Sequence, residues 1–292
     1  MRHAPYRLAQ RYAIRFGSSM HPHRAHAPTP DLRIVSTGSL MAHEDHDSQR
    51  SQPLIARLQA EEFVINPPVV APMDADQFVI LDGANRCHAF AVLNYPHVLV
   101  QVAPYESGFV ELQTWNHVVT DWTEEAFLQH VSELVGVQTL PGHHSEAVAH
   151  ITLTNGHTLA LIPNGSTVHE RSAALRQFVS VYQQHARLHR TSLSSPTEIW
   201  SLYERSVAFI QFPPYQPADI ITAARQQALL PPGVSRHIVY GRALRVNYPL
   251  AYLRDEHTAL ANKNEALQRW LRAKLANRQI RYYAEPTYQF DE

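Results

Sequence analysis

One short segment, residues 78–86, constrains this chain more than any other part of the sequence. Residues 78–81 form an apolar run typical of a buried strand, and residues 84–93 have the pattern of a helix. Asp82 and Gly83 lie between them, and glycine permits the tight turn that such a junction needs. The first backbone amides of a helix have no partner within the helix, so they can bind an anion. The segment therefore predicts a strand, a turn and a phosphate-binding helix N-terminus.

Two charged side chains could complete this phosphate site. Arg86 lies in the first turn of the expected helix and can add a guanidinium group. Asp82 can orient that arginine or hold a metal ion beside a phosphate. The alternative is that Asp82 only caps the helix while Arg86 is a solvated surface residue. The residues alone leave both readings open.

Composition narrows the classes of protein that this chain can belong to. Of 292 residues, 45% are hydrophobic, which is enough for a buried core. The 25 Lys and Arg residues nearly balance the 26 Asp and Glu residues, so nucleic acid is not the default partner. The only lysines are Lys263 and Lys274, so the lysine of a Walker A loop or a protein kinase strand is missing. Phosphate must be held by arginine, backbone amides or a metal.

The lack of a long apolar run and the presence of a single cysteine indicate where the protein works and what redox chemistry to expect. No apolar run approaches the ~20 residues of a spanning helix, so no membrane association is expected. The single cysteine, Cys87, excludes a disulfide framework and suits a reducing cytoplasm. We expect Cys87 to be a small buried helix residue rather than a redox group. The paired histidines His143 and His144 lie beside Pro141-Gly142 and are expected to be solvated.

The order of apolar patterns predicts a protein of mixed helices and strands whose two halves pack on each other. Residues 1–30 carry five arginines and no acidic residue, and we interpret them as a mobile extension. Residues 31–120 alternate strands and helices. Residues 121–292 continue the mixture of helices and strands. Within it, Asn155-Gly156 predicts a hairpin, and residues 256–277 and 280–283 predict a long helix and a final strand.

The strand-Asp-Gly-x-x-Arg-helix pattern resembles the ParB/sulfiredoxin-like superfamily, and particularly its free serine kinase branch. The resemblance extends from about residue 32 to residue 240 with order and spacing preserved. Its segments here are His43-Glu44 with Arg50 and the helix after it, Asn66-Pro67-Pro68-Val69, Asp82-Gly83 with Arg86, Thr114-Trp115, the strand 207–211 and Ser235-Arg236-His237. Ala84 stands where a sulfiredoxin would have its reactive cysteine, which separates this chain from that branch.

This resemblance implies an α+β fold with a cleft between a ParB/sulfiredoxin-like nucleotide-binding lobe, residues 31–120, and a mixed α/β substrate lobe, residues 121–292. It also implies an activity and a set of site residues. Members of the branch transfer a phosphoryl group from ADP or ATP, with Mg²⁺, to the hydroxyl of free serine or a similar small compound. Glu44 matches the catalytic glutamate that takes the serine proton, and Asp82 matches a catalytic residue that touches the phosphate-bound magnesium. The expected phosphate-binding residues are Arg50, Gly83, Ala84, Asn85 and Arg86. The expected substrate-binding residues are Trp115, Ser235, Arg236 and His237.

Two positions depart from the pattern of that branch. Asn85 stands where the turn usually has histidine, and Ser235 replaces a threonine. Asparagine can donate a hydrogen bond to phosphate but cannot titrate. A nucleotide-responsive transcriptional regulator that binds DNA and a noncatalytic small-molecule sensor are the alternative functions. The joint presence of Glu44 and the loop 235–237 favours an enzyme, because a DNA-binding switch needs no base aimed at a hydroxyl. Oligomeric state cannot be read from the sequence.

Overall fold

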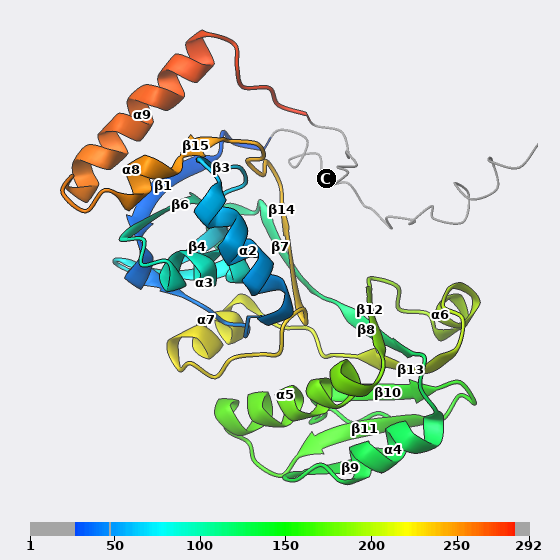
Figure 1. Ribbon diagram of the computed structural model, residues 1–292. Helices are drawn as coiled ribbons and strands as arrows, with labels where there is room; N and C mark the ends of the chain where they lie inside the picture. Colours follow the sequence, from blue (N-terminus) through cyan, green and yellow to red (C-terminus); the bar gives the residue numbers. More distant parts are fainter. Residues whose placement is uncertain (1–26, 47, 284–292) are drawn as a thin grey trace, which may run out of the picture.

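The structure is a computed structural model that describes residues 27–46 and 48–283, and only the backbone of residues 48–50. The expected extension, residues 1–30, lies outside the described residues except for its last four. The chain forms two sheet-based groups joined by a narrow ribbon (Figure 1). It is thus a mixed α and β structure, as the sequence predicted.

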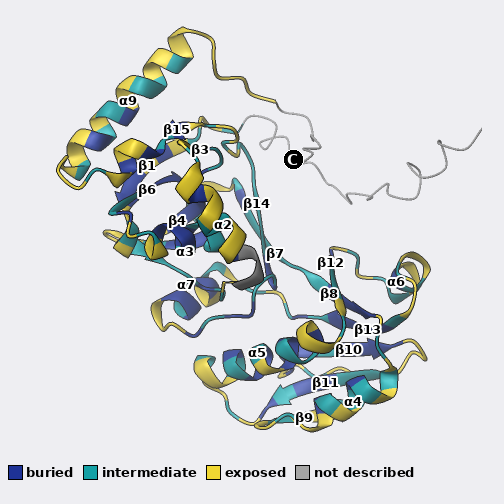
Figure 2. Ribbon diagram, in the orientation of Figure 1, coloured by how far each residue is buried: buried dark blue, intermediate teal, exposed yellow. Residues whose placement is uncertain are grey.

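A five-stranded mixed sheet organises the first group, in the order β1-β6-β4-β5-β2. Strand β6, which lies between β1 and β4, is buried almost throughout (Figure 2). Two helices, α2 and α3, pack against each other beside this sheet. The elements are β1 (Asp31–Ser36), η2 (Thr37–Ser39), β2 (Leu40–Met41), α2 (Ser48–Ala60), β4 (Val69–Asp74), β5 (Gln77–Asp82), α3 (Ala84–Val92) and β6 (His97–Val102).

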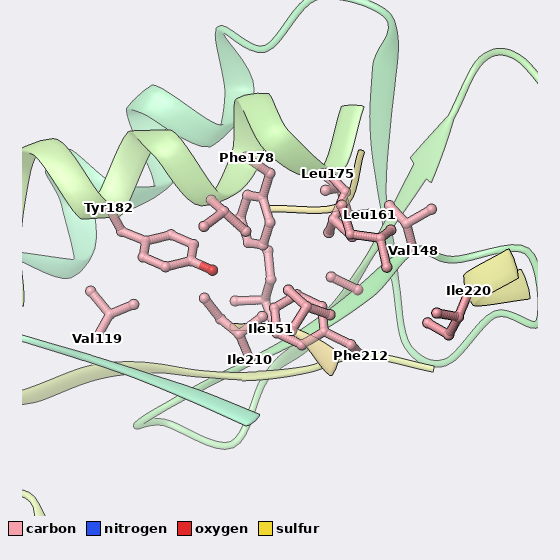
Figure 3. Packing of buried hydrophobic residues seen from close by; sticks show 14 of the residues in the cluster. Val119, Val148, Ile151, Leu161, Leu175, Phe178, Tyr182, Ile210, Phe212 and Ile220 are labelled. Carbon is pink, nitrogen blue, oxygen red and sulfur yellow. The ribbon is translucent and has the colours of Figure 1, made fainter. Parts of the chain in front are cut away.

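A six-stranded antiparallel sheet organises the second group, in the order β12-β8-β13-β10-β11-β9. The expected Asn155-Gly156 hairpin is confirmed as β10 and β11. Helix α5 covers the sheet, and Phe178 and Tyr182 point from it into the apolar core (Figure 3). The elements are β8 (Asn116–Thr120), α4 (Glu124–Ser132), β9 (Val137–Pro141), β10 (Ala149–Leu153), β11 (Thr158–Pro163), α5 (Val168–His185), β12 (Arg187–Thr191), α6 (Pro196–Leu202) and β13 (Ser206–Gln211). Helix α7 (Pro217–Arg225) follows β13 and contacts β5 of the first sheet.

The ribbon between the two groups consists of β7 (Val110–Thr114) and β14 (Ser235–Val239), which pair antiparallel. The short helix η3 (Tyr105–Ser107) leads into β7. Ser235 lies opposite Thr114, and Arg236 lies opposite Gln113. Trp115 separates β7 from β8, so it stands where the ribbon enters the six-stranded sheet. The Thr-Trp and Ser-Arg-His segments of the sequence are therefore neighbours.

The end of the chain returns to the first group. The pair β15 (Tyr248–Pro249) and β3 (Phe63–Val64), followed by α8 (Leu250–Arg254) and α9 (Leu260–Ala276), packs there. The Asn264 side chain bonds the backbone N–H and C=O of Ile34 in β1 at 2.9 and 2.8 Å. The limits of the domains stay a prediction. The helices α8 and α9 contact β6 and β1 of the five-stranded sheet, and β15 pairs with β3 outside that sheet.

Two sequence-based expectations about the C-terminal region and the membrane can be compared with the structure. The strand expected over residues 280–283 is wrong, because these residues have no regular structure and pair with no strand. Ile280, Tyr282 and Tyr283 are residue types enriched in strands, but they form a strand only where a sheet edge lies beside them. None of the helices in the described part of the chain combines the length and the apolarity that crossing a bilayer requires.

Candidate active site

A cavity of about 1250 Å³ opens between the first group and the ribbon. Every predicted site residue except Arg50 lines it, although these residues are up to 193 positions apart (237 − 44). Arg50 lies in the first turn of α2, and its side chain is outside the described part of the chain. The residues that the structure brings together are His43, Glu44, Asp82, Gly83, Ala84, Asn85, Arg86, Trp115, Ser235, Arg236 and His237.

The phosphate turn has the expected strand, glycine and helix. Gly83 has a φ of +94° and stands at the N-cap of α3 with no side-chain cap, so the first helical amides are not bonded by a capping side chain. Asp82 does not cap the helix. Its Oδ2 accepts a hydrogen bond from Arg86 Nη2 at 2.9 Å and another from Arg242 Nη2. Arg86 also donates to the carbonyl oxygen of Asn66 at 2.5 Å.

Asp82 is the centre of a small charge network on the cavity wall. Its partial burial acts to raise the pKa of the carboxyl, but the guanidinium groups of Arg242 and Arg86 outweigh it and hold the pKa of Asp82 below its usual range. Both arginines remain charged at neutral pH. The turn thus presents two guanidinium groups and a helix N-terminus, a combination suited to an anion of more than one charge.

Gly83 can be tested by substitution. A Cβ at this position would stand 3.0 Å from Arg86 Nη2 and 3.1 Å from the Pro68 Cβ, at a φ that L residues rarely adopt. We expect Gly83→Ala to cost about 1–2 kcal/mol of stability through backbone strain and to weaken phosphate binding by displacing Arg86. Thermal unfolding and nucleotide titration measure the two effects. Gly156→Ala, whose Cβ meets nothing within 4 Å at a similar φ, is the control for strain alone. Equal nucleotide affinity in both variants would contradict the role of Gly83.

Glu44 is fixed to the ribbon by both of its carboxylate oxygens. Its Oε1 accepts hydrogen bonds from the Ser235 N–H and from the Ser235 hydroxyl, both at 2.6 Å, and its Oε2 accepts one from the Gly233 N–H at 2.9 Å. The backbone pairs as well, since Leu230 N–H donates to the His43 carbonyl and Asp45 N–H to the Leu230 carbonyl, both at 2.8 Å. The Glu44 side chain is 14% exposed, so it still reaches the cavity.

A buried histidine fixes the loop that holds Glu44. Burial lowers the pKa of His117 to about 4, so the ring is neutral at physiological pH. Its Nε2 donates to the Gly233 carbonyl oxygen at 3.0 Å, and its Nδ1 accepts from the Tyr182 hydroxyl at 2.8 Å. Gly233 itself has a φ of +79°. A chain of hydrogen bonds thus runs from α5 through His117 and Gly233 to Glu44, and it sets the position of the carboxylate.

The opposite wall of the cavity carries an arginine stacked on an aromatic ring. The Arg236 guanidinium lies 4.3 Å from the centre of the Trp115 ring, and its Nη1 donates to Gln113 Oε1 at 3.3 Å. The ring and the bond to Gln113 hold the guanidinium group beside the cavity, and its planar fork suits bidentate binding of a carboxylate or phosphate. His237 is 2.7 Å from the Tyr105 hydroxyl through its Nε2, and burial together with His43 lowers the pKa of His237 to about 3.

Several residues that the sequence singled out lie apart from this chemistry. Cys87 is a buried helix residue, as expected, and burial raises the pKa of its thiol to about 12. Within residues 27–46 and 48–283, no three His, Cys, Asp or Glu side chains gather in a way that could hold a metal ion by themselves.

Sequence reasoning missed Arg242, which pairs with Asp82. The loop that carries it is held by Gln101, whose side chain donates to the Gly241 carbonyl at 3.1 Å and accepts from the Ala243 N–H at 2.8 Å. A further hydrogen bond holds the same loop, because the Arg245 N–H donates to Asn66 Oδ1 at 2.9 Å. The only available signal was the presence of Arg242 and Arg245 shortly after the 235–237 segment.

Among curated sequences, the chain is similar to a protein over nearly its full length. No family model matches the chain. The ATP-dependent L-serine kinase SbnI of Staphylococcus aureus is 22% identical over 268 residues, which cover 89% of this chain and 97% of that protein. The similarity therefore includes both groups of elements and the ribbon between them.

Solved structures give a consistent result. A C-terminally truncated SbnI from Staphylococcus aureus superimposes with a TM-score of 0.67 at 18% identity and covers 84% of this chain and 97% of its own. A mutant free serine kinase in complex with ADP superimposes with a TM-score of 0.66 at 13% identity, over 78% of this chain and 95% of its own. The chain shares the fold of these structures.

Proposed function

We propose that this protein is a serine kinase-like phosphotransferase that moves a phosphoryl group from a nucleotide to the hydroxyl of free serine or a similar small compound. The observation that carries the proposal is the convergence of three kinds of group on one cavity. These are the carboxylate Glu44, the phosphate turn 82–86 with Arg242, and the stacked Arg236. The similarity to SbnI over almost all of both chains supports the same activity.

The phosphate turn and its arginines bind the nucleotide phosphates in this proposal. Phosphoryl transfer depends on positioning and on compensation of the charge spread over the phosphate oxygens. Arg86 and Arg242 supply that compensation where other kinases use a lysine, and the N-terminus of α3 supplies backbone amides. When phosphates arrive, they compete with Asp82 for the two guanidinium groups.

Magnesium fits the residues of this turn as a companion of the nucleotide. Mg²⁺ commonly binds through one or two carboxylates together with phosphate oxygens. Asp82 provides a carboxylate at the turn, and the low pKa of that carboxyl keeps it ionised. When bound, the ion would neutralise charge on the transferring phosphate. Side chains of the protein bind the acceptor and take its proton.

Glu44 is the group that takes the proton of the acceptor hydroxyl. A serine hydroxyl is a weak nucleophile at neutral pH, and a positioned carboxylate helps by accepting its proton. Arg236, stacked on Trp115, binds the carboxylate of the amino acid or the phosphate of the product. This arrangement places recognition of the acceptor on the ribbon and recognition of the donor on the first group.

ATP is the first donor to test, because SbnI is ATP-dependent, and ADP is the second. The purified protein should be incubated with Mg²⁺, each nucleotide and a panel of hydroxyl compounds, among them L-serine, L-threonine, D-serine and glycerol. We expect phosphorylation of L-serine and little product from glycerol, which has no carboxylate for Arg236. Transfer to no member of the panel would contradict the proposal and favour a nucleotide-responsive regulator or a small-molecule sensor.

Arg242 provides a test of the donor site. We expect Arg242→Ala to weaken nucleotide binding about tenfold, because one charge-assisted contact is lost while Arg86 remains. The control is Arg225→Ala, which removes an arginine paired with Asp74 outside the cavity. Calorimetric titration of both variants with nucleotide measures the difference. If Arg242→Ala bound nucleotide as tightly as Arg225→Ala, Arg242 would be excluded from the donor site.

The same proposal includes the fold family of the first group and the cellular location of the protein. The first group, with its strand-Asp-Gly-x-x-Arg turn, is a ParB/sulfiredoxin-like nucleotide-binding lobe. The protein works in the cytoplasm, where free serine and nucleotides are both substrates of metabolism.

A further inference from the structure

The Ser235 hydroxyl stands between Glu44 and His43. Its oxygen is 2.6 Å from Glu44 Oε1 and 2.7 Å from His43 Nε2. The other ring nitrogen, Nδ1, is 2.8 Å from the Ile80 carbonyl oxygen. A carbonyl oxygen can only accept, so Nδ1 carries a hydrogen. Three polar groups are thus joined in a line from Glu44 through Ser235 to His43, which is 4% exposed.

Counting hydrogens shows that this line can accept an additional proton. The two contacts of the Ser235 oxygen each require one hydrogen, and the hydroxyl supplies one. With Glu44 ionised and His43 neutral, neither of them can donate the second hydrogen. One of the two contacts is then satisfied only after a further proton arrives, on Glu44 or on His43 Nε2. The geometry therefore leaves a position for the one proton that the acceptor hydroxyl releases.

The surroundings support His43 as the final position of that proton. Burial lowers the pKa of His43, which keeps the ring neutral and able to accept, while the neighbouring Glu44 carboxylate favours its protonated form. The ionisable groups that face the line are His237, whose ring centre is 5.5 Å from that of His43, and Tyr215, which interacts with Glu44. Both are neutral near pH 7, since burial lowers the pKa of His237 to about 3 and raises that of Tyr215.

We propose that Ser235 is a positioning residue that relays the proton of the acceptor hydroxyl from Glu44 to His43. This inference rests on the proposed phosphotransferase function. The acceptor O–H bond breaks and its oxygen bonds to phosphorus, while the bond from phosphorus to the leaving nucleotide oxygen breaks. Glu44 takes the proton, the protonated Glu44 donates to the Ser235 oxygen, and the Ser235 hydroxyl hydrogen passes to His43 Nε2. Glu44 is again a carboxylate, His43 is an imidazolium, and the proton later leaves by the same route.

Replacement of Ser235 tests the relay. Ser235→Ala keeps the backbone N–H that binds Glu44 and removes only the hydroxyl, whereas Ser235→Thr keeps the hydroxyl. We expect Ser235→Ala to lower kcat by about 10- to 100-fold, less than loss of the base itself, with little change in the KM for nucleotide. Ser201→Ala is the matched control, because that hydroxyl bonds only the Glu198 carbonyl on the surface of α6.

The pH profile separates the relay from a structural role. A proton shared by two hydrogen-bonded sites is held more tightly than a proton on one carboxylate. The acid limb of kcat is therefore expected to move to lower pH in Ser235→Ala and to return to the wild-type position in Ser235→Thr. A lower kcat with an unmoved limb would assign Ser235 to structure alone and overturn the relay.

A measurement on the wild-type protein covers the case in which Ser235→Ala does not fold. Nitrogen-15 spectra of the histidines are expected to show His43 with its hydrogen on Nδ1 and a bare Nε2 at the pH of the assay. A hydrogen on Nε2 throughout the assay range would overturn the relay, because the ring could not accept. If the wild-type protein transferred no phosphoryl group, both the proposed function and the relay would be wrong. If the wild-type protein transferred phosphoryl groups but the acid limb did not move in Ser235→Ala, or His43 carried its hydrogen on Nε2, only the relay would be wrong.

Discussion

Replacing Glu44 by glutamine is expected to lower phosphoryl transfer by ~10²- to 10⁴-fold, which is the usual contribution of a general base. Glutamine has almost the same size but no basic carboxylate, so it cannot take the acceptor proton. Nucleotide affinity is expected to stay close to that of wild type, because the phosphate turn 82–86 makes no direct bond to Glu44 in this structure. Single-turnover assays and nucleotide titration measure the two quantities separately.

The same substitution has a structural cost that must be controlled. Both oxygens of Glu44 accept from backbone N–H groups, of Gly233 and Ser235, and the amide nitrogen of glutamine would oppose one of them. A loss of about 1–3 kcal/mol of stability is therefore expected. Thr167→Ala is a useful comparison, because it lowers stability through a helix cap at the start of α5. Transfer at the wild-type rate in Glu44→Gln would remove Glu44 as the base.

Replacing Arg236 by alanine is expected to lower kcat/KM for serine by up to about 100-fold, because a charge-assisted, bidentate contact and its stacking on Trp115 are lost together. Lysine at this position keeps the charge but loses the planar fork. Arg236→Lys should therefore raise the KM for serine more than it lowers kcat. Steady-state kinetics with serine as the varied substrate measure both variants.

The donor site provides the internal control for Arg236. Nucleotide affinity should be unchanged in Arg236→Ala, since Arg236 lies on the ribbon and its bonds are to Gln113 and Trp115. Weaker nucleotide binding with an unchanged serine KM would place Arg236 on the donor side and contradict the division of the cavity proposed above.

The phosphate turn could be predicted because its signal is local. Residues 78–86 contain the strand, the glycine with positive φ, the helix start and Arg86, so short-range geometry determines nearly all of the turn. The Asn155-Gly156 hairpin is another case in which two residues specify the backbone. The joint position of Glu44 and residues 235–237 was available only through the resemblance, since nothing local joins residues so distant in sequence.

Features that depend on contacts between residues far apart in the chain could not be predicted from the sequence. Arg242 reaches Asp82 because Gln101, buried in β6, holds the loop around residue 242, and that contact spans about 140 positions. The hydrogen bonds of Glu44 to Gly233 likewise depend on His117 and the core beneath α5. The expected strand over residues 280–283 failed for the same reason, because a strand needs a partner edge that its own residues do not specify.

Formation of O-phosphoserine by the wild-type protein is the decisive test of the proposed phosphotransferase activity. The purified protein should be supplied with L-serine, Mg²⁺ and ATP labelled in the terminal phosphate, and the products followed by phosphorus NMR. We expect the label to appear in O-phosphoserine in equal amount to the ADP formed, and Glu44→Gln under the same conditions to form at most about a hundredth as much O-phosphoserine in the same time. Release of the label only as inorganic phosphate would contradict the proposed activity. The activity would also be contradicted if neither ATP nor, in a parallel assay, labelled ADP lost its terminal phosphate.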